Sequence, residues 1–125
     1  MSFQTKRVGA TPDAIAADGS EVRVLCATAR GSMAMFTLSP GAVSKAIVHR
    51  TVEELWYIAS GTGRMWRRFG EQEEVTELAP GVSLSMPLGT RFQFRCDGTD
   101  PLSAIGVTMP PWPGEDEAVF VNGPW

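Results

Sequence analysis

The chain has 125 residues, of which 43% are hydrophobic and 20% are charged. That length can bury a core as one domain, residues 1–125, without disulfide or metal staples, and the composition is ordinary for a globular protein. A net charge of −3 and a pI near 5.1 argue against a nucleic-acid-binding surface. No apolar stretch follows residues 1–7, and no run approaches the ~18 apolar residues of a spanning helix, so we expect a cytoplasmic protein with no membrane segment.

The elements predicted along the chain are short strands. Residues 1–20 are small, polar and irregular, and we expect them to form an arm outside the fold, with a helical turn conceivable only at 12–17. From residue 21 onward, alternating or β-branched runs are separated by glycines and prolines, a pattern typical of strands. The predicted strands are 21–26, 32–38, 45–49, 55–59, 64–69, 73–78, 82–86, 91–96 and 102–109.

The spacing of these strands predicts the fold class. Residues 55–59 and 64–69 flank a glycine-rich turn, so 55–69 is predicted to be a β-hairpin. Residues 73–78 are polar, which favours an edge or outer strand. Short strands with turn signals every ~8–12 residues, and no long helical period, predict an all-β sandwich or barrel.

The C-terminal tail, residues 110–125, contains four prolines and two tryptophans. A segment so rich in proline cannot form a central strand or a helix. Leaving both large indole rings in water is unfavourable. We therefore expect the tail to pack down, either on its own barrel or on a second subunit.

The two cysteines, Cys26 and Cys96, fit a reducing compartment as reduced, buried thiols. A reactive thiol needs a neighbouring base, and His49 is the single histidine of the chain. A structural role is therefore expected for both.

A glycine frame in residues 40–63 resembles the first motif of the cupin family. That motif consists of glycine, five residues, His-x-His, three or four residues, glutamate, six residues and glycine. Gly41 opens the frame here, and Glu54 and Gly61 have the closing spacing. Glycines of this kind supply turn geometry that other residues adopt poorly.

The histidine positions of this motif can be aligned in two ways. With four residues before Glu54, they fall on Ile47 and His49; with three, they fall on Val48 and Arg50. At least one family histidine is missing in either alignment. If Arg50 faces inward in place of His49, an anion-binding pocket becomes the expectation.

A second frame, residues 80–92, resembles the second cupin motif of glycine, five residues, Pro-x-Gly, two residues, histidine, three residues and asparagine. Gly81, Pro87 and Gly89 match its spacing. Phe92 occupies the histidine position, and Cys96 occupies the asparagine position.

The resemblance covers residues 32–109 and implies a small antiparallel β-barrel of the double-stranded β-helix, jelly-roll-like type. We expect this barrel to span about residues 20–109, between the N-terminal arm and the tail. The family commonly forms homodimers, and edge strands and apolar tails are often covered by a partner, so a homodimer is expected.

The departures from the motifs bear on metal binding. Cupins hold a divalent metal with imidazole nitrogens and one carboxylate. This chain offers His49 and Glu54, whereas Phe92 has no lone pair to donate; Glu53 and Cys96 are not at family ligand positions. We expect no tight metal site and no cofactor, with a divalent metal as the alternative.

The remaining inward residues predict a mainly apolar pocket with a few polar groups, the usual form of a small-molecule site. If His49 and Glu54 face the interior from adjacent strands and touch, the carboxylate orients the ring and makes it a candidate base. Arg64 and Trp66 lie two residues apart on a predicted strand, so their side chains face the same way, and Arg64 is the cation expected to bind a carboxylate or phosphate. If the strand is turned the other way, Met65 faces inward in place of Trp66. The expected ligand-binding residues are His49, Glu54, Trp56, Arg64, Trp66, Phe92 and Phe94.

Two functions follow from this pocket. The first is a small-molecule-binding cupin without a tight metal site, whose ligand is an aromatic compound or an organic acid. The alternative is an enzyme, either a metal-independent isomerase or lyase with His49 as base, or a metal-dependent oxygenase. The residues do not decide whether catalysis occurs or which ligand binds.

Overall fold

A computed structural model describes residues 2–125 and contains eleven strands and one short 3-10 turn in that range. Each predicted strand boundary lies within two residues of an observed one. The helical turn expected at 12–17 is wrong, because Ala14 and Ile15 pair with the edge of the next strand. The strands are β1 (Ala14–Ile15), β2 (Glu21–Ala27), β3 (Ser32–Leu38), β4 (Ile47–His49), β5 (Glu53–Ser60), β6 (Gly63–Phe69), β7 (Gln72–Leu78), β8 (Ser83–Met86), β9 (Arg91–Cys96), β10 (Leu102–Met109) and β11 (Ala118–Phe120).

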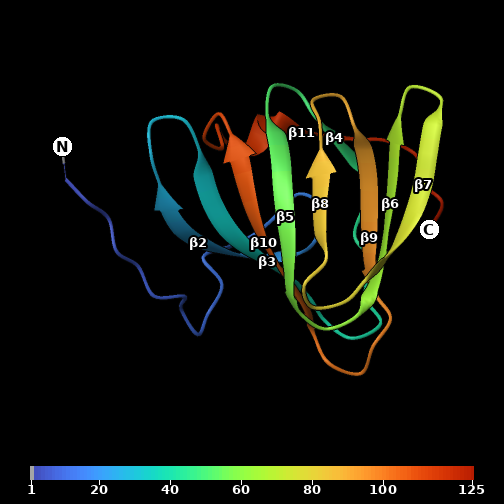
Figure 1. Cartoon of the computed structure of the whole chain (residues 1–125), viewed down its shortest axis with the longest axis horizontal. Coiled ribbons are helices and arrows are strands. Elements are labelled where there is room, and N and C mark those ends of the chain that lie inside the picture. The colour runs from blue at the N-terminus through green and yellow to red at the C-terminus, as the bar shows by residue number, and fades with distance from the viewer. Residues whose placement is uncertain (1) are drawn as a thin grey trace.

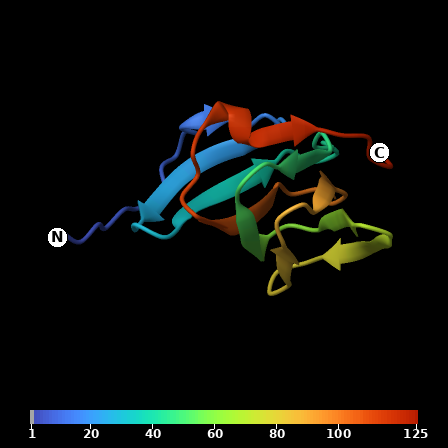
Figure 2. The ribbon, with the colours of Figure 1, turned by 90° about the horizontal axis from the view of Figure 1, so that it is seen from above.

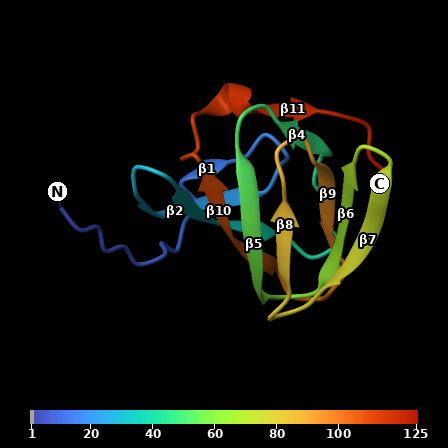
Figure 3. The same ribbon diagram turned by 45° about the horizontal axis from the view of Figure 1, so that its top comes forward.

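The strands form two antiparallel sheets that enclose a common interior, as the all-β barrel expectation required. One sheet has the order β1-β2-β3-β10-β5-β8 and the other has the order β11-β4-β9-β6-β7. Figure 1 shows the strands side by side, and the views in Figures 2 and 3 show how they curve around the interior. As predicted, β7 is an edge strand.

The predicted hairpin at 55–69 is wrong. β5 pairs with β10 and β8, whereas β6 pairs with β7 and β9, so the chain crosses from one sheet to the other at the glycine-rich turn. Gly61 has φ +82°, and a Cβ there would lie 2.4 Å from the carbonyl oxygen of Pro101. Such a turn carries the chain between sheets as readily as it closes a hairpin, so its residues alone do not distinguish the two.

The core lies between the sheets and is made by alternate residues of each strand. Trp56 and Ile58 of β5 are buried, whereas Leu55 and Tyr57 between them are about half exposed. β8 and β10 alternate in the same way, as period-two strands with one buried face should.

Both chain ends lie along the edges of this barrel. In the N-terminal arm, Gln4 accepts a hydrogen bond from Ala27 N, and the carbonyls of Gly9 and Ala10 accept from Arg23. The arm thus follows β2, the strand next to β1 at the sheet edge, and its beginning extends away from the barrel (Figure 1). No helix within residues 2–125 is long and apolar enough to cross a membrane.

The C-terminal tail packs on the barrel of its own chain, the first of the two arrangements expected from the sequence. After a 3-10 turn at Glu115–Glu117, β11 pairs with β4 at the edge of its sheet. Gln93 then fixes the chain end by donating to Trp125 O and accepting from Trp125 N. Figure 3 shows this tail passing over one end of the barrel.

Candidate functional site

His49 and Glu54 meet inside one end of the barrel. His49 Nε2 and Glu54 Oε1 are hydrogen-bonded, and only 7% of His49 and 3% of Glu54 are exposed. They come from β4 and β5, which belong to opposite sheets, so the expectation of adjacent strands is wrong although the contact is formed. Arg50 is exposed, and the motif alignment that places His49 inward is therefore the one the fold adopts.

Trp56 completes a three-residue network around the Glu54 carboxylate. Its indole Nε1 donates to Glu54 Oε2 at 2.7 Å, so each carboxylate oxygen has a partner. Trp56 and Glu54 share the inward face of β5, because they lie two residues apart on the strand. A buried carboxylate with two hydrogen-bond partners is held firmly in one orientation.

Aromatic rings pack tightly around this network. Trp56 stacks on Phe36 with centroids 5.3 Å apart and meets Phe94 edge-on at 4.9 Å. Gly106 of β10 makes this possible, because a Cβ there would lie 2.6 Å from the Phe36 ring and 3.0 Å from Trp56 Nε1. Phe92 and Phe94 are both buried on the inward face of β9, as expected. The predicted aromatic residues therefore fill this part of the interior with ring packing.

Trp112, from the tail, covers His49. The two ring centroids are 5.1 Å apart and nearly perpendicular, and Phe92 contacts His49 from another side at 5.4 Å. Trp112 remains 44% exposed, and its backbone N donates to Ser32 Oγ. Sequence reasoning predicted that the tail packs down but did not assign Trp112 to the site, because no motif links it to β4.

Asp18 is a further buried carboxyl group near the network that sequence reasoning missed. Its Oδ1 accepts from Ser20 N at 2.9 Å and from Ser20 Oγ at 2.7 Å. Burial raises the pKa of Asp18, and the charge of Glu54 raises it further, whereas the Ser20 hydrogen bonds and His49 lower it. The signal available in the sequence was an Asp-x-Ser turn, which is too common to indicate a buried acid.

The donor set does not fit a tightly bound metal. Both Glu54 oxygens are already hydrogen-bonded, and Phe92 lies where a third ligand is needed. Cys96 Sγ donates to Asp100 O, and Glu53 is exposed on the other face of β5. Within residues 2–125, no group of three or more His, Cys, Asp or Glu side chains lies close enough together to hold a metal ion.

Both cysteines are free thiols. Cys96 is buried as expected, but Cys26 is only half buried, because β2 lies near the outer edge of its sheet. Within residues 2–125, neither thiol forms a hydrogen bond with His49.

Arg64 and Trp66 do not enter the interior, so that expectation is wrong. The register of β6 on β9 pairs Met65 with Phe94 on the inward face and Trp66 with Gln93 on the outward face. Arg64 donates to Asp97 at 2.8 Å and lies over the Trp125 ring, and this ion pair holds the pKa of Asp97 below its usual value. Trp66 Nε1 donates to Glu73 at 2.6 Å. The two residues share a face, as predicted, but the tail covers that face.

Arg67 is the inward-facing arginine of β6. It stands opposite Phe92 in one ladder and opposite Glu74 in the other. Its Nη1 donates to Ser85 O on β8 at 2.9 Å, so it links the two sheets across the gap between their edges. The sequence contained a signal for Arg67: in the register that turns Met65 inward, Arg67, two residues further along the strand, also faces inward.

Three buried side-chain atoms in the described chain lack a hydrogen-bond partner: His49 Nδ1, Arg67 Nε and Thr90 Oγ1. All three lie toward the same end of the barrel. β4 and β9 pair Ile47 with Phe92, and continuing that register places Thr90 beside His49. Unpaired buried polar groups are rare and call for a physical explanation.

Two facing antiparallel sheets with this strand order define a double-stranded β-helix barrel. The sequence-family model of the cupin domain matches residues 34–108, and the chain belongs to this family. It is 34% identical over 83 residues to the xanthan biosynthesis protein XanB of Xanthomonas campestris pv. campestris. That alignment covers 66% of this chain but only 17% of XanB.

Solved structures share the fold at low sequence identity. An uncharacterised protein with a double-stranded β-helix domain from Klebsiella pneumoniae matches with a TM-score of 0.68 and 19% identity, covering 83% of this chain and 85% of that one. The capsular polysaccharide assembling protein CapF from Staphylococcus aureus matches with a TM-score of 0.69 and 17% identity, covering 83% of this chain and 30% of that one. At these identities the likeness extends to the fold alone.

Proposed function

We propose that this protein is a metal-independent cupin that binds a small organic molecule at the His49 end of its barrel. The observation that carries the proposal is the engagement of both Glu54 oxygens by His49 and Trp56. Because the network satisfies the carboxylate internally, it orients the imidazole without a metal. The Nδ1 atom of His49 is then the polar group left to meet a ligand.

The surroundings of His49 support a ligand with an apolar part. Phe92 and Trp112 contact the ring from two sides, and Trp112 is half exposed on an irregular segment. A ligand that reaches Nδ1 would displace or stack on Trp112. The names of XanB and CapF refer to polysaccharide synthesis, so sugars belong beside organic acids in the first ligand panel.

An enzyme that uses His49 as a base is the second candidate. When the neutral ring donates from Nε2 to Glu54, the lone pair resides on Nδ1, which can accept a substrate proton. The buried His49–Glu54 pair favours this reading, since a carboxylate that orients an imidazole is a common arrangement in general base catalysis. A metal-independent isomerase or lyase is the class that such a base serves.

A homodimer is part of the proposal. The outward face of the β3-β10-β5 sheet carries two cross-strand rows of apolar side chains. These rows are Leu55, Val107 and Met33, and Tyr57, Ile105 and Met35. Leu55 and Tyr57 are about half exposed, and because neither row contains a charge, a second copy can pack on the same patch without burying like charges. Light scattering should give a dimer mass that Tyr57→Lys reduces to a monomer mass.

Metal content and ligand binding test the main proposal together. Purified, tag-free protein soaked in iron, manganese, nickel or zinc should retain far less than one equivalent of metal. A panel of organic acids and sugars is then titrated against tryptophan fluorescence. Trp112→Ala should weaken binding about tenfold, whereas Trp125→Ala, in the same tail but on the far face, should leave it unchanged.

Turnover separates the two candidates. A binding protein should release every ligand chemically unchanged. A His49 enzyme should convert one of them, and His49→Gln should abolish conversion while leaving the dissociation constant within about threefold. Near-stoichiometric metal, or equal effects of the two tryptophan variants, contradicts the proposal.

A further inference from the structure

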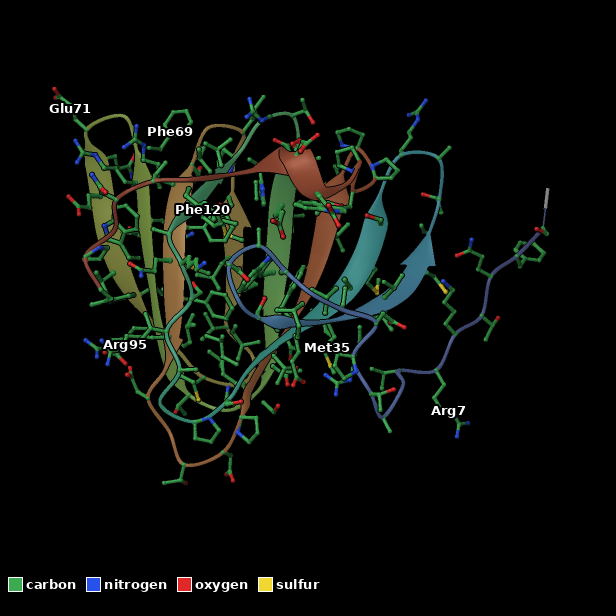
Figure 4. The ribbon with its side chains drawn as sticks, turned by 180° about the vertical axis from the view of Figure 1, so that it is seen from behind. Arg7, Met35, Phe69, Glu71, Arg95 and Phe120 are labelled. Carbon is green, nitrogen blue, oxygen red and sulfur yellow. The ribbon has the colours of Figure 1, made fainter. Side chains whose placement is uncertain are left out.

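A separate hollow lies where the free edges of β7 and β8 approach each other. It has a volume of about 300 Å³ and is lined by Arg67, Phe69, Gln72, Glu74, Pro87 and Thr90. Figure 4 shows Phe69 and Glu71 at the β6–β7 turn, at the end of the barrel opposite the loop below Arg95. The hollow shares no lining residue with the His49–Glu54–Trp56 network, and Thr90, which lies beside His49 in the β4–β9 register, is where the two come nearest.

Two of its polar groups have hydrogen-bonding capacity to spare. Thr90 is only 4% exposed, and its Oγ1 has no partner. Arg67 uses Nη1 and Nη2 in bonds to Ser85, Glu74 and Thr76, while its buried Nε–H has no acceptor. A buried hydroxyl can both donate and accept, so a ligand that offers one hydroxyl group can satisfy Thr90 and a second can satisfy Arg67.

The charge of the hollow is balanced. Glu74 Oε1 lies 2.5 Å from Arg67 Nη2 and also accepts from Thr76, and these bonds leave Glu74 Oε2 to accept from a ligand. A carboxylate ligand would have to displace Glu74 from Arg67. A neutral ligand that is rich in hydroxyl groups meets donors and acceptors together without that cost.

The remaining walls supply an apolar surface. The Phe69 ring is 52% exposed and Pro87 lies across the hollow from β7. A pyranose ring has one face of C–H groups that packs on such a ring and hydroxyl groups at its rim. The Gln72 amide adds a further donor and acceptor at the opening.

We propose that this hollow is a binding subsite for a neutral sugar ring of monosaccharide size. Phe69 packs on the apolar face of the ring, and Thr90, Arg67 and Glu74 bond to its hydroxyl groups. The His49 site need bind nothing for this to hold, so the two proposals can fail separately.

Amide chemical shifts measured by NMR on the full chain test the subsite. The probes are methyl hexopyranosides of different stereochemistry, each with its matching uronate. A neutral glycoside should shift the amides of Phe69, Gln72 and Thr90. Phe69→Ala should weaken binding about tenfold, and Thr90→Val, which keeps the shape, about fivefold.

Phe120→Ala is the matched control, because Phe120 is 57% exposed and lies on β11, at the opposite edge of its sheet from β7. It should leave glycoside binding unchanged. A glycoside bound here should leave the indole N–H signal of Trp112 unshifted, whereas one bound at the proposed His49 site should shift it, which separates the two sites. The inference is overturned if no glycoside shifts these amides, if only uronates do, or if Phe69→Ala and Phe120→Ala weaken binding equally.

Discussion

The His49 end of the barrel has two sides, one formed by β4 and β5 and the other by β6, β7 and β8, and their polar side chains differ in their surroundings. On the side of β4 and β5, both Glu54 oxygens are hydrogen-bonded, and the unpaired Nδ1 of His49 lies beneath the half-exposed Trp112 ring. On the side of β6, β7 and β8, Arg67 and Thr90 have unpaired atoms and Phe69 is half exposed. On the first side the polar groups lie under packed aromatic rings, whereas on the second side they line an open hollow.

This difference shows how a fold can retain the place of a site while changing its chemistry. Phe92 stands at the second-motif position where the family has a ligating histidine, and its ring packs on both His49 and Trp56. A ligand position has thus become a packing position. Function on such a fold has to be argued from the side chains present, because one barrel serves many activities.

The largest expected effect on stability comes from replacing a phenylalanine by alanine, and the same replacement can be made on each side. Phe94→Ala removes a fully buried ring that packs on Trp56, and we expect it to lower the free energy of unfolding by about 3–5 kcal/mol. Phe69→Ala removes a half-exposed ring and should cost under about 1 kcal/mol. Urea denaturation of both variants measures the contrast, and similar losses would remove the distinction between core and surface.

The next effect tests the network itself. Glu54→Gln keeps the shape but replaces one of the two oxygens that bond to His49 and Trp56 by an NH2 group, which cannot accept. We expect a loss of about 1–3 kcal/mol, the cost of leaving a buried donor without an acceptor. The ¹⁵N shifts of the His49 ring should change as well, because the group that bonds to Nε2 changes from a carboxyl to an amide. Leu84→Ile, a buried change on β8 outside the network, is the control and should leave those shifts in place.

The strands could be predicted from the sequence because their alternation is a local property. Arg91–Cys96 and Leu102–Met109 match the predicted ranges, and burial alternates along Leu102–Met109. In Arg91–Cys96 the alternation is broken at Gln93, which is buried because the C-terminal tail bonds to it. Sheet membership is not local. The turn at Gly61 was compatible with a hairpin or with a crossing between sheets, and only the pairing of β5 with β10 decides the matter.

The candidate site was likewise predicted only in part, because local spacing can be read from the sequence and contacts between distant segments cannot. The motif spacing placed His49 and Glu54 in one site, and their contact now fixes the motif alignment. Arg64 was assigned inward from the parity of Trp66, but parity leaves open which of the two faces is inside. Trp112 could not be assigned at all, because its contact with His49 joins segments more than 60 residues apart.

A smaller effect with a defined pH dependence is expected at Asp18. Burial raises the pKa of Asp18, so the native state holds this proton at pH values where the unfolded chain has lost it. Stability from this group is therefore complete below the ordinary pKa of 3.8 and is lost as pH rises through the raised native value. Asp18→Asn keeps an oxygen for Ser20 and should be more stable than the parent at neutral pH, by less than Glu54→Gln loses. Denaturation from pH 3 upward should show the gap between the two proteins opening with pH, and a constant gap contradicts the assignment.

The smallest effect distinguishes an unused hydroxyl group from a used one. Thr90→Val removes the buried Oγ1 without changing the side-chain shape, and because that atom has no protein partner, no hydrogen bond is lost. We expect stability within about 0.5 kcal/mol of the parent, or a small gain. Thr108→Val is the matched comparison, since Thr108 is equally buried but bonds to Ser32 Oγ at 2.6 Å, and it should lose about 1 kcal/mol. If Thr90→Val loses as much as Thr108→Val, Thr90 has a structural partner and the open side of the barrel end is part of the core. If it does not, the hydroxyl contributes nothing to folding, and it is free to bond to a ligand.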